Sequence, residues 1–204
     1  MRNVAFILLL IATFGCKNDS SNDSVSPADM TMKPVMVQAK DPKDLTIPSA
    51  CEMIGEPEIQ KILNISGIYV DIKEADDPGN LTTKSCFFKW NDPNTPNAGI
   101  LIQILTNPVY DEYPEYISKF VSSKLTDGET LMGNDNPSRF KKFKSGNTVG
   151  AYSFEQGKFY WNHNNDYLFM LAFNVSTLTN DQMVKSAEAI VAEVNKNFVS
   201  KAAL

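Results

Sequence analysis

The chain has 204 residues, of which 43% are hydrophobic, 21% are charged and 10% are aromatic. This composition is typical of a globular protein and excludes collagen-like, coiled-coil and wholly disordered chains. The 24 acidic residues outnumber the 19 basic ones, and the formal net charge is −5. Nucleic-acid binding requires clustered cations, so we expect no nucleic-acid partner and a single domain preceded by a tail.

The first residues have the form of an export signal. Arg2 is followed by an apolar run of 11 residues, 4–14, and then by Gly15-Cys16. Such a run rises about 16 Å as a helix, only half of the ~30 Å hydrocarbon core of a bilayer. We therefore predict that residues 1–15 are a signal peptide that is removed rather than a membrane-spanning anchor.

The end of this signal resembles the lipobox of bacterial lipoproteins, with Gly15 and Cys16 at matching positions. The resemblance implies that the Cys16 thiol is diacylglycerylated, that the signal is cut before Cys16 and that the new amino group is acylated. Thr13 and Phe14 replace the usual Leu and small residue, a looseness common among lipoproteins of the Bacteroidetes type. A plain secretory signal with an incidental cysteine is the alternative.

Residues 16–47 are expected to be a flexible, lipid-anchored tether. Residues 17–27 contain almost nothing that could be buried, and several prolines continue the extended region. Such a tether would hold the domain on a membrane of the cell envelope, most simply the outer membrane, on its periplasmic or its surface face. Ser24 lies in a segment similar to an O-glycosylation acceptor of the same bacteria, although an Asp/Ser-rich linker is the simpler interpretation.

Assigning Cys16 to lipid leaves Cys51 and Cys86 as an even pair in a compartment where disulfides persist, so we expect them to be bonded. Closing this loop of about 35 residues would stabilise the fold by roughly 3 to 4 kcal/mol in the chain-entropy model. A catalytic thiol or a zinc site would need more partners than the one histidine, His163, which lies far along the chain in an Asn-rich turn-like segment.

The expected globular domain, residues 48–204, begins with one helix and three strands. Pro57 suits the first turn of a helix over residues 56–64. Alternation of β-branched and aromatic residues predicts strands at residues 68–73, 85–90 and 99–106. The last two should form a hairpin, because the Pro- and Asn-rich segment between them does not fit a central strand.

A central helix is predicted next, from Asp111 as its cap to Asp127-Gly128. Residues 127–147 are expected to be mostly loop, with room for a strand at residues 140–144. A hairpin over residues 151–161 should follow.

The last predicted strand, residues 167–173, is almost entirely apolar and should be buried on both faces. Thr179 and Gln182 have the spacing of a capping box, which predicts the start of a long C-terminal helix.

Strands that occur in runs between these helices predict an α+β domain. Its mostly antiparallel sheet of about five to six strands should pack with a short N-terminal helix, a central helix and a long C-terminal helix. Three motifs look like those of a large set of two-cysteine bacterial lipoproteins of unknown function: Cys51-Glu52-Met53-Ile54, Cys86-Phe87-Phe88-Lys89-Trp90 and Gly150-Ala151-Tyr152. The resemblance covers about residues 49–200 and implies a disulfide and a fold similar to the PsbP and Mog1-type sandwiches, but no catalytic residue.

Two features are candidates for partner binding. Four cations, Arg139, Lys141, Lys142 and Lys144, lie close together in an acidic protein and could meet an anionic partner; a strand with its polar residues outward is the simpler interpretation. Tyr160 and Trp161 point to opposite faces of a strand, so one ring would be exposed as an anchor for a partner unless helices cover both faces. Core packing of both rings is the alternative.

No motif supports a cofactor or a metal. The sequence has no nucleophile elbow, phosphate loop or calcium loop, and its acidic pairs fall at turns and helix starts. We therefore expect a non-enzymatic envelope lipoprotein that binds a protein or glycan partner. The alternatives are a carboxylate-dependent envelope hydrolase or transferase, and an inhibitor or immunity-type lipoprotein.

Overall fold

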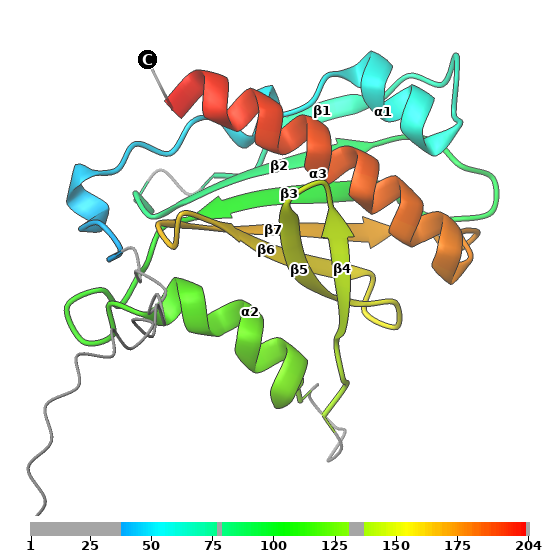
Figure 1. Cartoon of the computed structure of the whole chain (residues 1–204). Coiled ribbons are helices and arrows are strands. Elements are labelled where there is room, and N and C mark those ends of the chain that lie inside the picture. Colours follow the sequence, from blue (N-terminus) through cyan, green and yellow to red (C-terminus); the bar gives the residue numbers. More distant parts are fainter. Residues whose placement is uncertain (1–37, 77–78, 131–136, 203–204) are drawn as a thin grey trace, which may run out of the picture. The chain divides into compact units, whose positions relative to one another are not determined.

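A computed structural model describes residues 38–76, 79–130 and 137–202 (Figure 1). Within these residues the fold is α+β, as predicted, with one antiparallel sheet of seven strands. The α-helices are α1 (Glu56–Leu63), α2 (Tyr116–Thr126) and α3 (Asn180–Ala202). The predicted signal peptide, the lipidation site Cys16, the candidate glycosylation site Ser24 and most of the predicted tether lie outside the described residues.

Two antiparallel meanders meet in the middle of the sheet. The first contains β1 (Asp71–Glu74), β2 (Thr83–Lys89) and β3 (Gly99–Leu105), and the second contains β4 (Lys141–Ser145), β5 (Thr148–Ser153), β6 (Lys158–His163) and β7 (Tyr167–Asn174). The spatial order is β1-β2-β3-β7-β6-β5-β4. The chain thus passes from β3 through α2 to the far edge and returns strand by strand until β7 pairs with β3. This path leaves β1 and β4 as the two edge strands.

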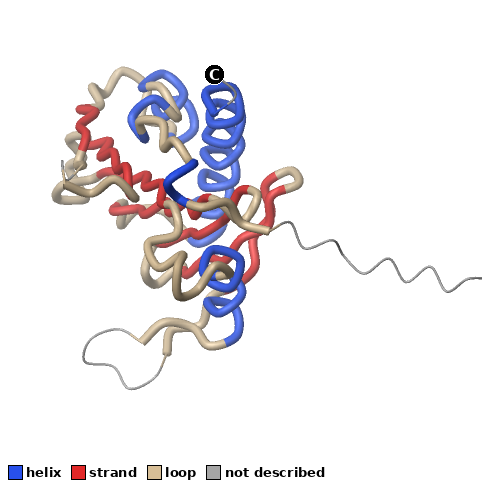
Figure 2. The backbone as a smooth tube through the Cα atoms, turned by 90° about the vertical axis from the view of Figure 1, so that its left-hand side faces the viewer, coloured by secondary structure: helices blue, strands red, loops and turns tan. Residues whose placement is uncertain are grey.

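Helices cover both faces of the sheet. Helices α1 and α3 lie on one face, together with the short 3-10 helix η2 (Ala50–Glu52), whereas α2 lies on the opposite face over β5 and β6 (Figures 1 and 2). The larger core, under α1 and α3, includes Phe88, Ile102, Phe159, Trp161, Phe169 and Phe198. The smaller core, under α2, includes Ile117, Phe140, Tyr160 and Leu168. Strand β7 contributes side chains to both cores. It is therefore buried on both faces, as its nearly continuous apolar sequence predicted.

The capping box at the start of α3 is confirmed. The Thr179 N–H donates to Gln182 Oε1 at 2.9 Å, and the Gln182 N–H donates to Thr179 Oγ1 at 3.4 Å. These reciprocal bonds satisfy donors that an uncapped helix start would leave free. The helix then crosses the sheet, and its buried face includes Ile190, Val194 and Phe198.

The expected five to six strands are corrected to seven. The additional strand is β4, which lies in a region expected to be mostly loop. It pairs with β5 through a two-residue turn in which Gly146 adopts a φ of 57°, a conformation that glycine tolerates without steric cost. Only Phe143 and Ser145 of β4 are buried, so the strand lacks the apolar content by which a buried strand is recognised.

The central helix begins later than predicted. Asp111 is not its cap; Glu115 is the residue before the first helical residue, Tyr116. Residues 107–115 form a turn instead, in which the Asn107 side chain donates to the carbonyl of Tyr113 at 2.8 Å. Pro114 explains the shift, because a proline disfavours helical backbone geometry at the residue before it.

The first strand also begins later than predicted, at Asp71 instead of residue 68. The preceding backbone bonds to α1: Gln60 Nε2 donates to the carbonyl of Ile68 at 2.7 Å, and the Val70 N–H donates to Glu56 Oε1 at 3.0 Å. The side chains of Gln60 and Glu56 thus satisfy backbone groups that would otherwise bond to a neighbouring strand.

Residues 38–47, assigned to the tether from the sequence, lie against the domain. Leu45 and Ile47 pack on the larger core. The Lys40 N–H donates to Asp166 Oδ1 at 2.8 Å, and the Tyr167 hydroxyl donates to the carbonyl of Thr46 at 3.1 Å. The domain therefore includes this segment, because the segment contains apolar side chains that the core can bury.

Candidate binding surfaces

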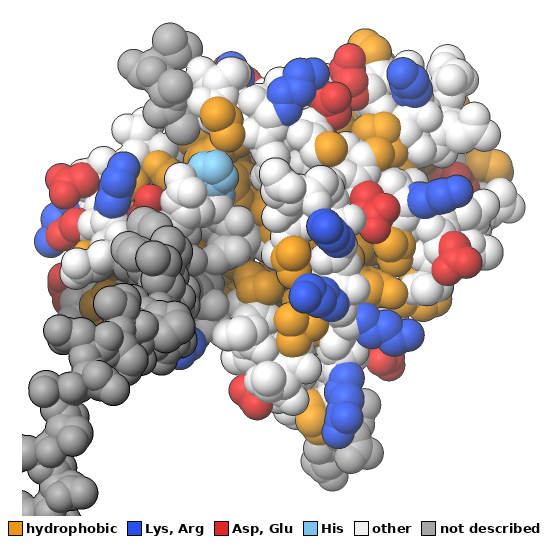
Figure 3. All heavy atoms as spheres, in the orientation of Figure 1, with side chains coloured by type: hydrophobic (Ala, Val, Ile, Leu, Met, Phe, Trp, Pro, Cys, Tyr) orange, Lys and Arg blue, Asp and Glu red, His pale blue; other side chains and the backbone are white. Residues whose placement is uncertain are grey.

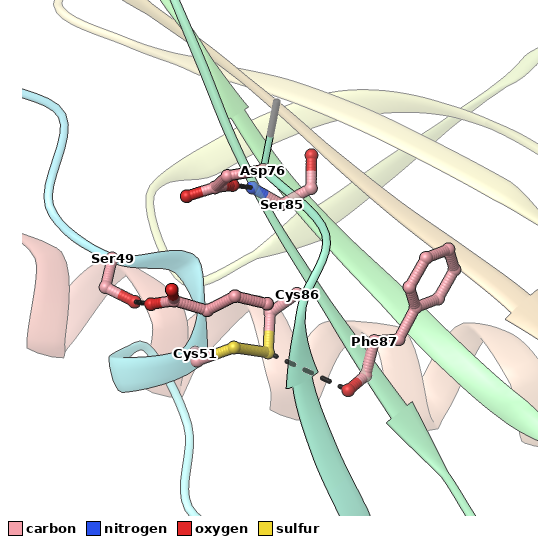
Figure 4. Close-up of a disulfide and its surroundings, with 7 residues drawn as sticks. Ser49, Cys51, Asp76, Ser85, Cys86 and Phe87 are labelled. Carbon is pink, nitrogen blue, oxygen red and sulfur yellow. Dashed lines mark hydrogen bonds between the residues drawn. A yellow bond between two sulfur atoms is a disulfide. The ribbon is translucent and has the colours of Figure 1, made fainter. Parts of the chain in front are cut away.

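Cys51 and Cys86 form the predicted disulfide, with their Cα atoms 5.0 Å apart (Figure 4). Cys51 lies in η2 and the fully buried Cys86 lies in β2. A hydrogen bond of 2.8 Å from Ser49 Oγ to Glu74 supports the same junction (Figure 4). The bond therefore joins the segment that enters the domain to the sheet.

Trp161, a candidate anchor, is a core residue with no exposed surface. Its ring stacks on Phe169 with centroids 5.1 Å apart, and its indole N–H donates to Asn195 Oδ1 of α3 at 3.0 Å. The buried donor thus has an acceptor on the helix that covers it. The proposed role of Trp161 as a surface anchor is corrected to one of joining the sheet to α3.

Tyr160, the second candidate anchor, is also buried, with 6% of its surface exposed. Its ring lies 5.2 Å from that of Phe120 in α2 and 5.7 Å from that of Phe140. Burial raises the pKa of the Tyr160 phenol, and the negative charge of Glu129 raises it further. Because helices cover both faces of the sheet at this point, neither aromatic side chain is available to a partner.

A partly buried cation, Lys124, lies at the margin of the core beneath α2. Lys124 Nζ lies 2.9 Å from Glu129 Oε2 and 4.8 Å from the ring centroid of Phe120. Lys158 Nζ of β6 lies 3.7 Å from the other carboxylate oxygen of Glu129. These contacts hold the segment after α2 against the sheet, which is a structural role.

The four predicted cations lie together at one edge of the sheet. Arg139 precedes β4, Lys141, Lys142 and Lys144 belong to it, and all four side chains are exposed. In the space-filling view, basic side chains gather over β4 and the segment that leads into it (Figure 3). Strand alternation places Lys141 on the α3 face and the other two lysines on the α2 face.

These four cations have no ion pair within the described residues, whereas seven lysines elsewhere do, namely Lys43, Lys84, Lys119, Lys124, Lys158, Lys196 and Lys201. A hollow of about 260 Å³ lies beside the strand, lined by Arg139 and Lys141 and by the half-exposed Phe154. One carboxylate, that of Glu155, also lines this hollow, so the edge combines an excess of positive charge with an accessible aromatic ring. Together these four cations and Phe154 are called the basic edge below.

His163 lies between the sheet and α3 rather than at an exposed hairpin tip. Its ring centroid is 5.2 Å from that of Phe198. Burial lowers the pKa of His163, and the nearby carboxylate of Asp166 opposes this effect. Asp166 is the one buried charged side chain among the described residues, and it accepts the Lys40 N–H. The hydrogen bond between Lys40 and Asp166 holds residues 38–47 against the domain. Within the described residues no second buried carboxylate lies beside Asp166.

A second candidate surface, which sequence reasoning did not single out, lies at the opposite side of the sheet. A hollow of about 810 Å³ is lined by Tyr69, Asp71, Lys89, Trp90, Asp92 and Asn97. It meets a smaller hollow of about 330 Å³ at Lys89 and Asn97. The sequence marks Lys89 and Trp90 only as parts of a strand, since their meeting with Tyr69 depends on the pairing of β1 with β2.

Two further findings concern the part of the chain that the structure describes. No three His, Cys, Asp or Glu side chains are grouped there so that they could hold a metal ion. No helix there combines the length and the apolar content that crossing a membrane requires. Comparison of the chain with protein-family models, with curated proteins and with solved structures finds no match. The resemblance to two-cysteine lipoproteins therefore stays a prediction.

Proposed function

We propose that the protein is an envelope lipoprotein, anchored through Cys16, whose domain binds an acidic partner without catalysing a reaction. The basic edge is the observation that carries this proposal. These four clustered cations form no ion pair with any other described residue, although the chain has a net charge of −5. Such a cluster speeds encounter with a negatively charged surface and selects against positively charged ones.

Burial of Tyr160 and Trp161 changes how binding would work. The hydrophobic contribution would come from Phe154 beside the hollow, 44% exposed, instead of from the two core rings. The lysines of β4 also disfavour strand pairing between another chain and the open edge of β4. Such pairing would strip water from their ammonium groups or bring them close to other positive charges. Recognition would therefore use the side chains of the basic edge rather than strand addition.

Two further features support an exported binding protein. The Cys51–Cys86 disulfide is stable in oxidising compartments such as the cell envelope. Among the described residues Asp166 is the one buried carboxylate, and its hydrogen bond from the Lys40 N–H gives it a structural role.

Photocrosslinking in cells tests the proposal. A photoreactive amino acid at position 142 on β4 is compared with one at position 73 on β1, the other edge of the sheet. Both positions are exposed lysines. The proposal predicts a discrete crosslinked partner from position 142 that is absent from position 73. Identical products from both positions, or none from position 142, would contradict it.

A further inference from the structure

We propose that the hollow at the ends of β1, β2 and β3 binds a neutral glycan. This inference is independent of the basic edge, because β1 and β4 are opposite edges of the sheet. The two joined hollows, about 810 and 330 Å³, fall in the range of about 300 to 1,000 Å³ that is typical of ligand sites. They are called the glycan hollow below.

The wall of the glycan hollow has an exposed aromatic ring on a fixed backbone. Tyr69 is 73% exposed, more than any other aromatic side chain in the described part of the chain. Yet both neighbouring residues bond to α1, through the carbonyl of Ile68 and the N–H of Val70. An aromatic ring held in this way loses little conformational entropy when a ligand stacks on it. The apolar C–H face of a pyranose ring is a ligand that fits.

Among the described residues, two charged side chains of the hollow have no ion-pair partner. Asp71 and Lys89 are paired in register across β1 and β2, but within the described residues they form no ion pair. Lys89 Nζ lies instead over the ring of Phe87, 4.9 Å from its centroid. The hollow thus presents an acceptor and a donor side by side, which is what vicinal hydroxyl groups require.

Trp90 adds a second aromatic side chain to the wall of the hollow, with 6% of its surface exposed. Its Nε1–H has no hydrogen-bond partner among the described residues and lies beneath the accessible surface. A ligand in the hollow would therefore meet the exposed part of the ring rather than this N–H.

The loop over the hollow is held in place before a ligand arrives. Asp92 Oδ1 accepts the N–H groups of Asn94 and Thr95 at 2.7 and 2.9 Å. Asn174 at the end of β7 donates to the carbonyl of Asn97 at 2.7 Å. A preformed site of this kind binds with a smaller entropy cost than one that must order on binding.

The charges of the hollow select the ligand class. The wall of the hollow contains two carboxylates, those of Asp71 and Asp92, and one ammonium group, that of Lys89. The two carboxylates would repel an acidic saccharide, and Lys89 would repel a cationic one. A neutral saccharide uses both kinds of group as hydrogen-bond partners. The smaller, more apolar hollow leaves room for a second sugar unit.

Titration calorimetry of the full-length protein in detergent, against neutral di- to tetrasaccharides of glucose, galactose, mannose and N-acetylglucosamine, tests this inference. We expect at least one of them to bind. Tyr69→Ala should weaken that binding by about three- to tenfold, the range for one aromatic contact, whereas Tyr69→Phe should retain it. Tyr113→Ala, which removes a tyrosine that is exposed and outside both hollows, is the matched control and should change nothing.

A second variant separates ligand recognition from folding. Trp90→Phe keeps a ring in the core but reduces the aromatic surface of the wall, so it should weaken binding while the thermal transition stays cooperative. Binding by none of the neutral saccharides, binding by uronic-acid saccharides alone, or equal binding by Tyr69→Ala would overturn the inference. A protein crosslinked from position 69 in place of any saccharide would identify the hollow as a protein interface. Crosslinking from position 142 reports on the basic edge and should be unaffected by these variants.

Discussion

The indole N–H of Trp161 donates to Asn195 Oδ1 at 3.0 Å, which joins the middle of β6 to α3. Asn195 Nδ2 donates in turn to Thr148 Oγ1 of β5 at 2.8 Å. One amide side chain thus connects the C-terminal helix to two strands. This relationship explains why Trp161, the most conspicuous aromatic residue of the hairpin, stabilises the domain and is not available for binding.

The variant Asn195→Ala should destabilise the domain by about 1 to 3 kcal/mol, because it leaves a buried indole donor without an acceptor. For a domain of this size each kcal/mol lowers the melting temperature by about 2 to 4 °C, which calorimetry can measure. The neighbouring variant Lys196→Ala, which removes an exposed ion pair with Glu193, should stay within about 0.5 kcal/mol of the wild type. If the two variants lowered the melting temperature equally, the Asn195 contact would stabilise the domain no more than an exposed ion pair does.

The double variant Cys51→Ala, Cys86→Ala should melt several degrees below the wild type. The bond closes a loop of 35 residues, worth roughly 3 to 4 kcal/mol in the chain-entropy model before any change in packing. Wild-type protein treated with a reductant should approach the melting temperature of the variant. Thiol titration of freshly purified, non-reduced protein is the direct check, and two free thiols there would refute the bond.

Stability should fall in mildly acidic solution in a way that depends on His163. The folded-state pKa of His163 lies below its ordinary value of 6.5, because burial disfavours the charged ring. As pH falls below about 6.5 the unfolded chain takes up this proton first, so the free energy of unfolding decreases. The variant His163→Gln should lose part of this dependence between about pH 6.5 and 5. Parallel curves of melting temperature against pH for the two proteins would contradict the assignment.

Lipidation at Cys16 is tested by metabolic labelling with a fatty-acid probe. The wild type should be labelled and should fractionate with membranes, because two or more acyl chains give stable anchoring. The variant Cys16→Ser should lose the label, whereas the variant that lacks Cys51 and Cys86 should keep it. Equal labelling of Cys16→Ser would exclude the predicted anchor.

Sequence patterns predicted most elements of this fold, since their residues have strong local preferences. The capping box of α3, the apolar strand β7 and the pairing of Cys51 with Cys86 follow from spacing and composition alone. Strand β4 was harder to predict. It is short, mostly exposed and rich in lysine, so its pairing with β5 depends on the rest of the sheet.

The candidate sites were predicted less well, and the reason is tertiary packing. The exposure of Arg139, Lys141, Lys142 and Lys144 agrees with charge patterning. The burial of Tyr160 and Trp161 required knowing that α2 and α3 lie on opposite faces of the sheet. The glycan hollow was not predicted, because it joins residues from three separate segments, and no local pattern marks Tyr69 as exposed or the Trp90 N–H as unpaired.

The affinity of the partner crosslinked from position 142 tests the central claim most directly. It is measured for the wild type, for Lys141→Glu with Lys142→Glu, and for Lys61→Glu with Lys73→Glu. The second pair makes the same change in net charge with exposed lysines that have no ion pair in the described residues.

Measurements at roughly 20 and roughly 300 mM salt separate electrostatic from apolar contributions. We predict that reversal at β4 weakens binding about tenfold at low salt and much less at high salt, while the control pair changes it little. Equal weakening by both pairs, or a loss that does not depend on salt, would contradict a partner held by the basic edge.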